Sequence, residues 1–151
     1  MSLMGAKFKP KDKIYGVLVY YKKDEKSGKT ICHFKDPYYD FGSCIYHALL
    51  KSKCPLFGYY EDYQKTDLYD NIVSKVLDHY PKKYGVSSCN MEVDTFSEKI
   101  GCDLAWENLK DRVDRARIFA LEILKKKAYQ EFLDFSMRIV AIRIDKSSKR
   151  K

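Results

Sequence analysis

The stretch VDTFSEKIGCDLAWENL, residues 93–109, decides the fold, because it marks the start of the longest predicted helix. Thr95 and Glu98 have the T-x-x-E spacing of a capping box, in which each side chain accepts a hydrogen bond from the other residue's backbone N–H. Gly101 follows in the second turn, where glycine costs roughly 1 kcal/mol relative to alanine. We therefore expect another backbone, most simply the preceding strand 84–93, to approach the helix at Gly101.

From that start, no Gly or Pro interrupts residues 102–136. Apolar residues recur at spacings of three and four, which predicts an amphipathic helix over 96–133. About 37 residues would extend roughly 55 Å, beyond the roughly 40 Å diameter expected of a compact domain of this size. Either the helix breaks near 115–118, or it packs against a second copy in a homo-oligomer. The apolar positions are Trp106, Leu109, Val113, Ala116, Ala120 and Ile123.

The rest of the chain predicts an α+β fold in a single domain, 1–151. β-branched and aromatic runs indicate strands, and apolar spacings of three and four indicate helices. Ser43 and either Thr66 or Asp67 are the expected caps of two short helices. In chain order we expect a β-hairpin (14–20 with 30–34), a connector (35–43) and the two short helices (43–53 and 66–80). A strand (84–93), the long helix (96–133), a final strand (137–144) and a basic tail (145–151) follow.

Composition indicates a protein of the cytoplasm. At 151 residues, 45% hydrophobic and 15% aromatic, the chain can bury a core. No run approaches 18 apolar residues, so we expect no membrane span, and the basic, polar start at 1–13 has no secretory signal. Its first three residues resemble a remnant of expression. The five cysteines are expected to be reduced and mostly buried, as is usual in a reducing compartment.

The positive charge is concentrated at the two ends. The net charge is +8, of which residues 7–13 and 145–151 supply +3 each, leaving about +2 for the body. Basic tails bind the phosphates of nucleic acids without sequence preference, but they also occur as solvated tails that keep proteins in solution. The tail residues with a candidate role in nucleic-acid binding are Lys146, Lys149, Arg150 and Lys151.

Tyrosines gather in one part of the chain. There are thirteen in all, and rings interspersed with lysines are typical of surfaces that bind single-stranded nucleic acid or a protein. They can equally cover the core with the ring packed and the hydroxyl in water. The candidate binding residues are Tyr38, Tyr39, Tyr59, Tyr60 and Tyr63.

A cysteine-dependent hydrolase is the alternative from another class. Cys44 lies close to the expected start of the helix 43–53, where the helix dipole would favour a thiolate, and His79 or His33 could serve as base. Metal chemistry is weakly supported, because the adjacent Cys32 and His33 point to opposite faces of a strand and the carboxylates are scattered. We expect no metal and no cofactor.

One motif resembles a known family. The residues that carry it are Cys89, Asp94, Phe96, Gly101, Leu104 and Ala105. Their order resembles a motif in small accessory proteins of bacteriophages and mobile elements of Firmicutes. In that motif a strand is followed by C-x(3-4)-D-x-F and then by a helix that contains G-x-x-L-A. Glu92–Val93 and Asn108–Leu109 depart from that pattern. A similar order of Cys, Asp and Gly suggests that 32–49 and 89–109 form an internal repeat.

Together these patterns favour a non-enzymatic binding protein over the hydrolase. The resemblance implies a phage or prophage origin and a cytoplasmic setting, and it supplies no catalytic residue. The expected partner is either a protein or a nucleic acid, with possible self-association through the helix 96–133.

Overall fold

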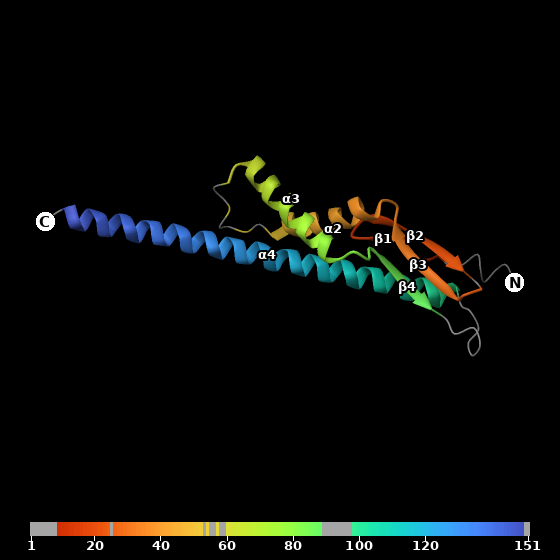
Figure 1. The fold of residues 1–151 in the computed structure, drawn as a ribbon. Helices are drawn as coiled ribbons and strands as arrows, with labels where there is room; N and C mark the ends of the chain where they lie inside the picture. Colours follow the sequence, from red (N-terminus) through yellow and green to blue (C-terminus); the bar gives the residue numbers. More distant parts are fainter. Residues whose placement is uncertain are drawn as a thin grey trace.

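The computed structural model describes residues 9–24, 26–52, 54, 57, 60–88 and 98–149, and shows an α+β fold. Four strands form an antiparallel sheet in the order β1-β2-β3-β4, and three helices accompany it (Figure 1). The elements are β1 (Lys13–Ile14), β2 (Val17–Asp24), β3 (Lys29–Phe34), α2 (Pro37–Ser52), α3 (Asp62–His79), β4 (Tyr84–Ser88) and α4 (Glu98–Lys149).

The predicted N-terminal hairpin is confirmed, although its first strand is divided. β2 and β3 pair antiparallel from Val19 opposite Phe34 to Asp24 opposite Lys29. β1 precedes them through a two-residue turn in which Tyr15 has φ 49° and Gly16 has φ 79°. Positive φ at both central residues matches the right-handed twist of a tight hairpin. The run predicted as one strand, 14–20, therefore contains this turn.

α4 covers one face of the sheet, and α2 and α3 pack against α4 farther along its length (Figure 1). The centre of the covered face is buried. Val19 of β2 is paired with Phe34 of β3, and Cys32 of β3 is paired with Gly85 of β4, and all three side chains on β2 and β3 are buried. The core continues along α4 as a single apolar stripe. The buried stripe residues of α4 are Cys102, Ala105, Leu109, Val113, Ala116, Ala120, Leu124 and Ala128.

α2 begins at Pro37, so the predicted connector 35–43 is wrong for most of its length. The Tyr39 backbone N–H donates to Asp36 Oδ1 at 3.2 Å, which makes Asp36 the N-terminal cap in place of Ser43. Proline is well suited to the first helical position, because the N–H it lacks has no intrahelical partner there. Asp36 and Pro37, which the sequence analysis assigned to a loop, therefore form the start of a helix.

α3 also begins earlier than predicted, at Asp62. Glu61 and Gln64 form a reciprocal capping box, and the Glu61 N–H donates to Gln64 Oε1 at 2.8 Å. Neither Thr66 nor Asp67 is the cap, because both lie within the helix. The helix ends at His79, close to the predicted end.

α4 is one continuous helix of 52 residues, which excludes one of the two alternatives for the long helix and corrects the prediction of a final strand. There is no break near 115–118, and the final strand expected over 137–144 is helical. The β-branched run favours a strand by propensity, but a helix satisfies every backbone group within the segment, whereas a strand needs a neighbouring edge. The expected tail is helical as far as Lys149. The helix is about 78 Å long, and its C-terminal end projects away from the rest of the protein (Figure 1).

Candidate binding surfaces

The start of α4 is tied to the sheet by polar and close-packed contacts. Thr95 lies outside the described residues, and Glu98 forms an ion pair with Lys23 of β2. A Cβ added at Gly101 would lie 2.6 Å from Thr30 Oγ1 on β3, with Ser87 of β4 next at 3.6 Å. The sequence pointed to strand 84–93 as the neighbour, whereas the nearest atom belongs to β3.

A second glycine, which the sequence analysis did not single out, makes a closer approach than Gly101 does. A Cβ added at Gly85 of β4 would lie 2.1 Å from the Ala105 carbonyl oxygen and 2.5 Å from the Leu109 backbone nitrogen. β4 and α4 therefore meet backbone to backbone at this point. A glycine at the second position of a predicted strand is the signal that could have indicated it.

The structure separates the predicted tyrosine set. Tyr38 and Tyr39, 56% and 70% exposed, lie in the first turn of α2. Tyr63 is exposed on α3, and the Tyr60 hydroxyl donates to Glu131 of α4. Tyr59 lies outside the described residues. The described members thus occupy at least two places rather than one continuous surface.

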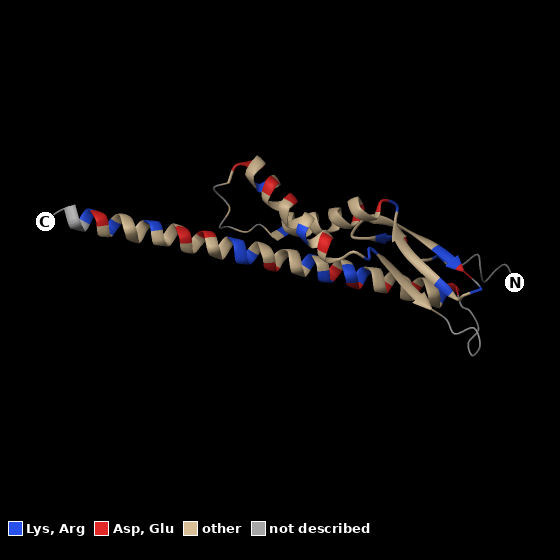
Figure 2. Cartoon of the chain, viewed as in Figure 1, with Lys and Arg blue, Asp and Glu red and all other residues tan. Residues whose placement is uncertain are grey.

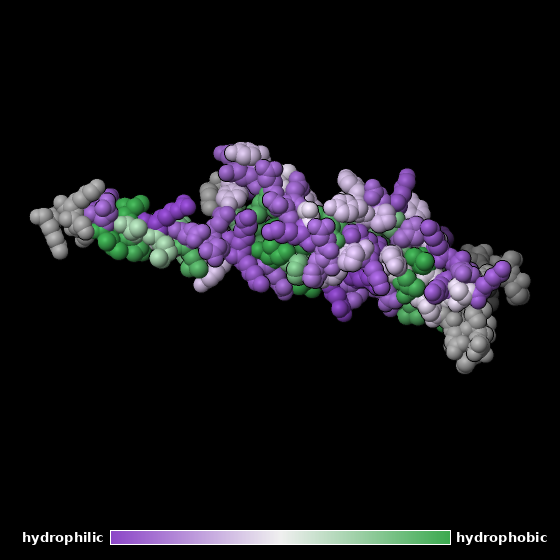
Figure 3. All heavy atoms as spheres, viewed as in Figure 1, coloured by the Kyte–Doolittle hydropathy of each residue, from purple (hydrophilic) through white to green (hydrophobic). Residues whose placement is uncertain are grey.

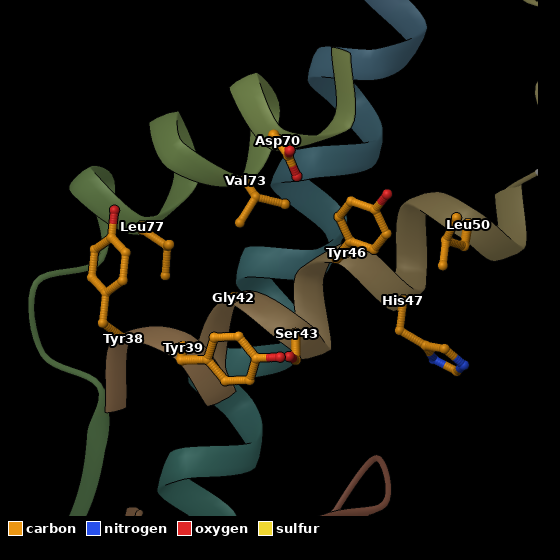
Figure 4. A pocket seen from close by; sticks show the side chains of 10 residues that line it. All are labelled: Tyr38, Tyr39, Gly42, Ser43, Tyr46, His47, Leu50, Asp70, Val73 and Leu77. Carbon is orange, nitrogen blue, oxygen red and sulfur yellow. The ribbon is translucent and has the colours of Figure 1, made fainter. Parts of the chain in front are cut away.

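Tyr38 and Tyr39 line a shallow pocket of about 460 Å³ between α2 and α3 (Figure 4). Tyr46 of α2 and Val73 and Leu77 of α3 complete its mostly apolar wall, and Gly42 lies at its base. Besides these groups, the lining contains the carboxylate of Asp70, the hydroxyl of Ser43 and the imidazole of His47. The full lining is Tyr38, Tyr39, Gly42, Ser43, Tyr46, His47, Leu50, Asp70, Val73 and Leu77.

The geometry around Cys44 does not support the hydrolase alternative. Cys44 is buried in the second turn of α2, and its thiol points to the Ile14 carbonyl at 3.9 Å. Burial raises the pKa of Cys44 to about 11, against the effect of the nearby Arg117 charge. The His79 ring stacks on Phe119, with centroids 4.7 Å apart and planes within 10°. In the described part of the chain, the Cys44 thiol and the His79 ring therefore each interact with other residues and not with each other.

No group of three or more His, Cys, Asp or Glu side chains is placed to hold a metal ion within the described part of the chain. Cys32 is buried on the covered face of the sheet, and its strand neighbour His33 lies on the opposite face, as the alternation of a strand requires. The two residues do not converge on one site.

The uncovered face of the sheet carries aromatic rings that the sequence analysis missed. Tyr20 of β2 pairs with His33 of β3, and His33 pairs with Tyr84 of β4, so the three lie in one row across three strands. The rings of Tyr20 and His33 are 6.2 Å apart between centroids. The signal was the alternation along β2 and β3, which assigns every second residue to this face.

The projecting end of α4, residues 129–146, is rich in exposed apolar side chains. Eight large apolar side chains between 129 and 144 are 38–68% exposed, and Figure 3 shows hydrophobic residues along this end of the helix. None of the helices in the described chain is long and apolar enough to cross a bilayer. The eight are Tyr129, Phe132, Leu133, Phe135, Met137, Val140, Ile142 and Ile144.

The predicted basic tail belongs partly to this helix. Lys146 is exposed at the end of α4, and Lys149 is the last helical residue. Arg150 and Lys151 lie outside the described residues. Basic and acidic residues alternate along α4 as a whole (Figure 2), so the helix does not present one uniformly basic side.

A groove of about 1090 Å³ separates the first half of α3 from the projecting end of α4. Leu68, Phe132 and Phe135 form its apolar part. Asp67 on α3 and Asp134 on α4 give it negative charge, and Lys127 and Arg138 give positive charge. Its lining is Tyr60, Gln64, Asp67, Leu68, Asn71, Lys127, Glu131, Phe132, Asp134, Phe135 and Arg138.

Comparisons of the chain with protein-family models, with curated proteins and with solved structures give no match. Function therefore has to be argued from the geometry. The resemblance of residues 89–105 to phage accessory proteins, and the cytoplasmic setting it implies, stay predictions.

Proposed function

We propose that this protein is a non-enzymatic binding protein that self-associates through the projecting end of α4, with a second copy packed antiparallel to the first. The observation that carries the proposal is the exposure of eight large apolar side chains on a helix segment that projects past the other described helices and strands (Figure 1). Exposed apolar patches of this kind mark interaction surfaces in folded proteins.

The apolar row continues the buried stripe of α4 at the spacing of a helix–helix seam. Ala128 is the last buried residue, and Phe132, Phe135, Ile139 and Ile142 follow at intervals of four, three, four and three. Spacings that alternate in this way place residues on one side of a helix and let a second helix pack along them. The row is symmetric about residue 137, so an antiparallel copy places phenylalanine opposite isoleucine at each layer.

The charges favour an antiparallel over a parallel copy. Between residues 131 and 146, the carboxylates Glu131 and Asp134 precede residue 137, whereas three basic residues, Arg138, Arg143 and Lys146, and one carboxylate, Asp145, follow it. An antiparallel copy brings the acidic half of one helix beside the basic half of the other, while a parallel copy brings like charges together. Opposite charges along helix flanks set partner choice and orientation in paired helices.

The apolar seam supplies part of the contact. Its exposed members Phe132, Phe135 and Ile142, at about 200 Å² each and near half exposure, offer roughly 300 Å² per copy, against about 800 Å² per partner in a standard protein interface, so the groove between α3 and α4 has to supply much of the rest. The groove between α3 and α4 would receive the last turns of the partner's helix. Its acidic residues Asp67 and Asp134 would then face the basic residues of that helix end.

The test measures molar mass by light scattering during size-exclusion chromatography. The native chain should elute as a dimer, and the double variant Phe135→Gln, Ile139→Gln should elute as a monomer with unchanged helix content. Glutamine keeps helix propensity while removing the apolar row. The matched control is Met137→Gln, Ile144→Gln, which removes two apolar residues from the other side of the same segment and should remain dimeric. A monomeric native chain would refute the proposal.

Orientation is tested by the distance between nitroxide labels in the dimer. Labels at residue 136 should lie close together, whereas labels at residue 125 should be about 36 Å apart along the axis of an antiparallel pair. Short distances at both positions would indicate a parallel dimer and contradict the arrangement proposed here.

A further inference from the structure

We infer that the uncovered face of the sheet is a binding site for single-stranded nucleic acid. Its central feature is the row of Tyr20, His33 and Tyr84, one residue from each of three adjacent strands. Aromatic side chains on such a platform stack against unpaired bases, and they do so with little sequence preference, because every base has a flat face.

The rings are accessible in the absence of a ligand. Tyr20 is 43% exposed and Tyr84 is 38% exposed, while His33 is half-buried between them. The planes of Tyr20 and His33 are inclined by 32° to each other. The row thus presents partly uncovered ring faces side by side, which is the requirement for a stacking surface.

The charges on the same face suit a polyanion. Lys13, Lys22 and Lys29 have cross-strand partners on this face and are exposed, and the acidic residue among the paired positions, Asp24, lies directly opposite Lys29. These lysines lie on both sides of the aromatic row, since Lys13 is paired opposite Leu18 and Lys22 opposite Ile31. Bases on the rings would leave phosphates within reach of lysines at either edge.

The site is also held rigid from behind. α4 packs on the covered face, where Gly85 allows backbone contact with Ala105, and the Asn108 side chain donates to the Val86 carbonyl. A preformed surface loses little conformational entropy when it binds. A duplex would not use the row, because its base faces are stacked inside the helix, so the geometry favours single strands.

The test is fluorescence anisotropy with labelled 12-nucleotide oligo-dT, oligo-U and a mixed-sequence duplex, measured from low to physiological salt. The native chain should bind the single strands more tightly than the duplex. The double variant Tyr20→Thr, Tyr84→Thr keeps β-propensity and should lower single-strand affinity at least tenfold, since each lost stack costs roughly fivefold or more. The variant Tyr20→Phe, Tyr84→Phe keeps the rings and should retain binding.

The matched control is Leu104→Gln, Ile118→Gln, which removes two exposed apolar side chains from α4 and should leave affinity unchanged. The variant Lys13→Gln, Lys22→Gln, Lys29→Gln should flatten the slope of log affinity against log salt by about 2, because each phosphate contact contributes about 0.7 for single strands. Oligo-dT and oligo-U compared side by side show whether the sugar matters.

Several outcomes would overturn the inference: no binding at low salt, equal binding of the duplex, or equal loss in the control variant. Binding of a peptide or protein that depends on Tyr20 and Tyr84 while oligonucleotides do not bind would assign the face to a protein instead. The measurements are repeated in the Phe135→Gln, Ile139→Gln background, so that failure of the dimer proposal and failure of this one are distinguishable.

Discussion

The hydroxyl of Tyr15 donates a hydrogen bond to Asp114, 99 residues further along the chain, and so fixes the first hairpin turn onto α4. Tyr15 is the one non-glycine residue with positive φ in the described chain. The Arg117 guanidinium lies 3.7 Å from the centre of its ring, and the same side chain donates to the Cys44 carbonyl at 2.9 Å. This cluster joins β1, α2 and α4, and it holds a backbone conformation that tyrosine otherwise disfavours.

The first prediction concerns that hydrogen bond. Tyr15→Phe should lower the free energy of unfolding by about 1.5 kcal/mol at pH 7, which is the lower end expected for a hydrogen bond to a charged group, because the pair is exposed. Burial alone would raise the pKa of Asp114, but hydrogen bonds from Lys110 and Tyr15 lower it overall. A lowered pKa contributes stability that is present at neutral pH and is lost as the pH falls through the folded-state value.

Urea unfolding of the native chain and of Asp114→Asn at pH 7 and near pH 3 measures this effect. The difference between the two proteins should shrink in acid. An equal difference at both values would show that Asp114 does not act through its charge.

The second prediction concerns Gly85. Gly85→Ala should destabilise the protein by roughly 3 kcal/mol or more, because the added Cβ would lie 2.1 Å from a backbone oxygen that cannot move without shifting α4. Gly42→Ala is the matched control: its Cβ would meet only the side chains of Leu77 and Val73 at 3.4 Å, and alanine is favoured within a helix. Thermal unfolding should show a large loss for the first variant and little change for the second. Similar melting temperatures would contradict the close backbone contact.

The third prediction concerns buried thiols. Burial raises the pKa of Cys44 to about 11 and that of Cys32 to about 12. In the unfolded chain these thiols ionise near pH 9, while in the folded chain they keep their protons. Unfolding therefore becomes easier as the pH rises above 9, by about 1.4 kcal/mol per pH unit for each thiol.

Alkylation at pH 8 should accordingly be slow at both residues in the native protein, and the partly exposed Cys54 should react before them. Urea unfolding at pH 8.5 and 10.5 should show the fall in stability, and Cys44→Ala should reduce it. Rapid modification of Cys44 at pH 6 would instead revive the hydrolase alternative.

The fourth prediction separates charge from stacking in nucleic-acid binding. Deletion of residues 146–151 removes four basic residues, and if they contact phosphates it should flatten the salt slope for duplex DNA by about 3.6 and weaken binding to all sequences alike. The preference for single strands should remain, because it resides on the sheet. Replacement of Lys125, Lys126 and Lys127 by glutamine is the control, since it removes similar charge from another part of α4. An unaltered slope after the deletion would exclude the tail from the contact.

Sequence patterns predicted which helices and strands form better than they predicted the residues at which these begin and end. The α+β class, the hairpin and an uninterrupted helical stripe after Gly101 could be read from local periodicity. The start of α2 could not, because Asp36 and Pro37 act equally well in a loop and at a helix N-terminus. The segment 137–144 was interpreted as a strand from its β-branched residues, and no local signal showed that it lacks a partner strand.

The candidate sites depended on information that local patterns do not contain. The row of Tyr20, His33 and Tyr84 exists only because three strands pair in one register, and β4 follows β3 after two intervening helices. The tyrosines near one another in sequence, by contrast, were divided between α2 and α3. Proximity along the chain was a poor guide to proximity in space here.

The continuous backbone of α4 has a mechanical consequence. It contains no proline, and its one glycine is at the sheet-bound end, so nothing within it acts as a hinge. The sheet contacts α4 around Ala105, about 48 Å along the axis from residue 137. Two copies joined antiparallel at that point would carry their sheets about 100 Å apart at opposite ends of a stiff bar. Such an assembly would hold two separate stretches of a single-stranded nucleic acid at a fixed distance from each other.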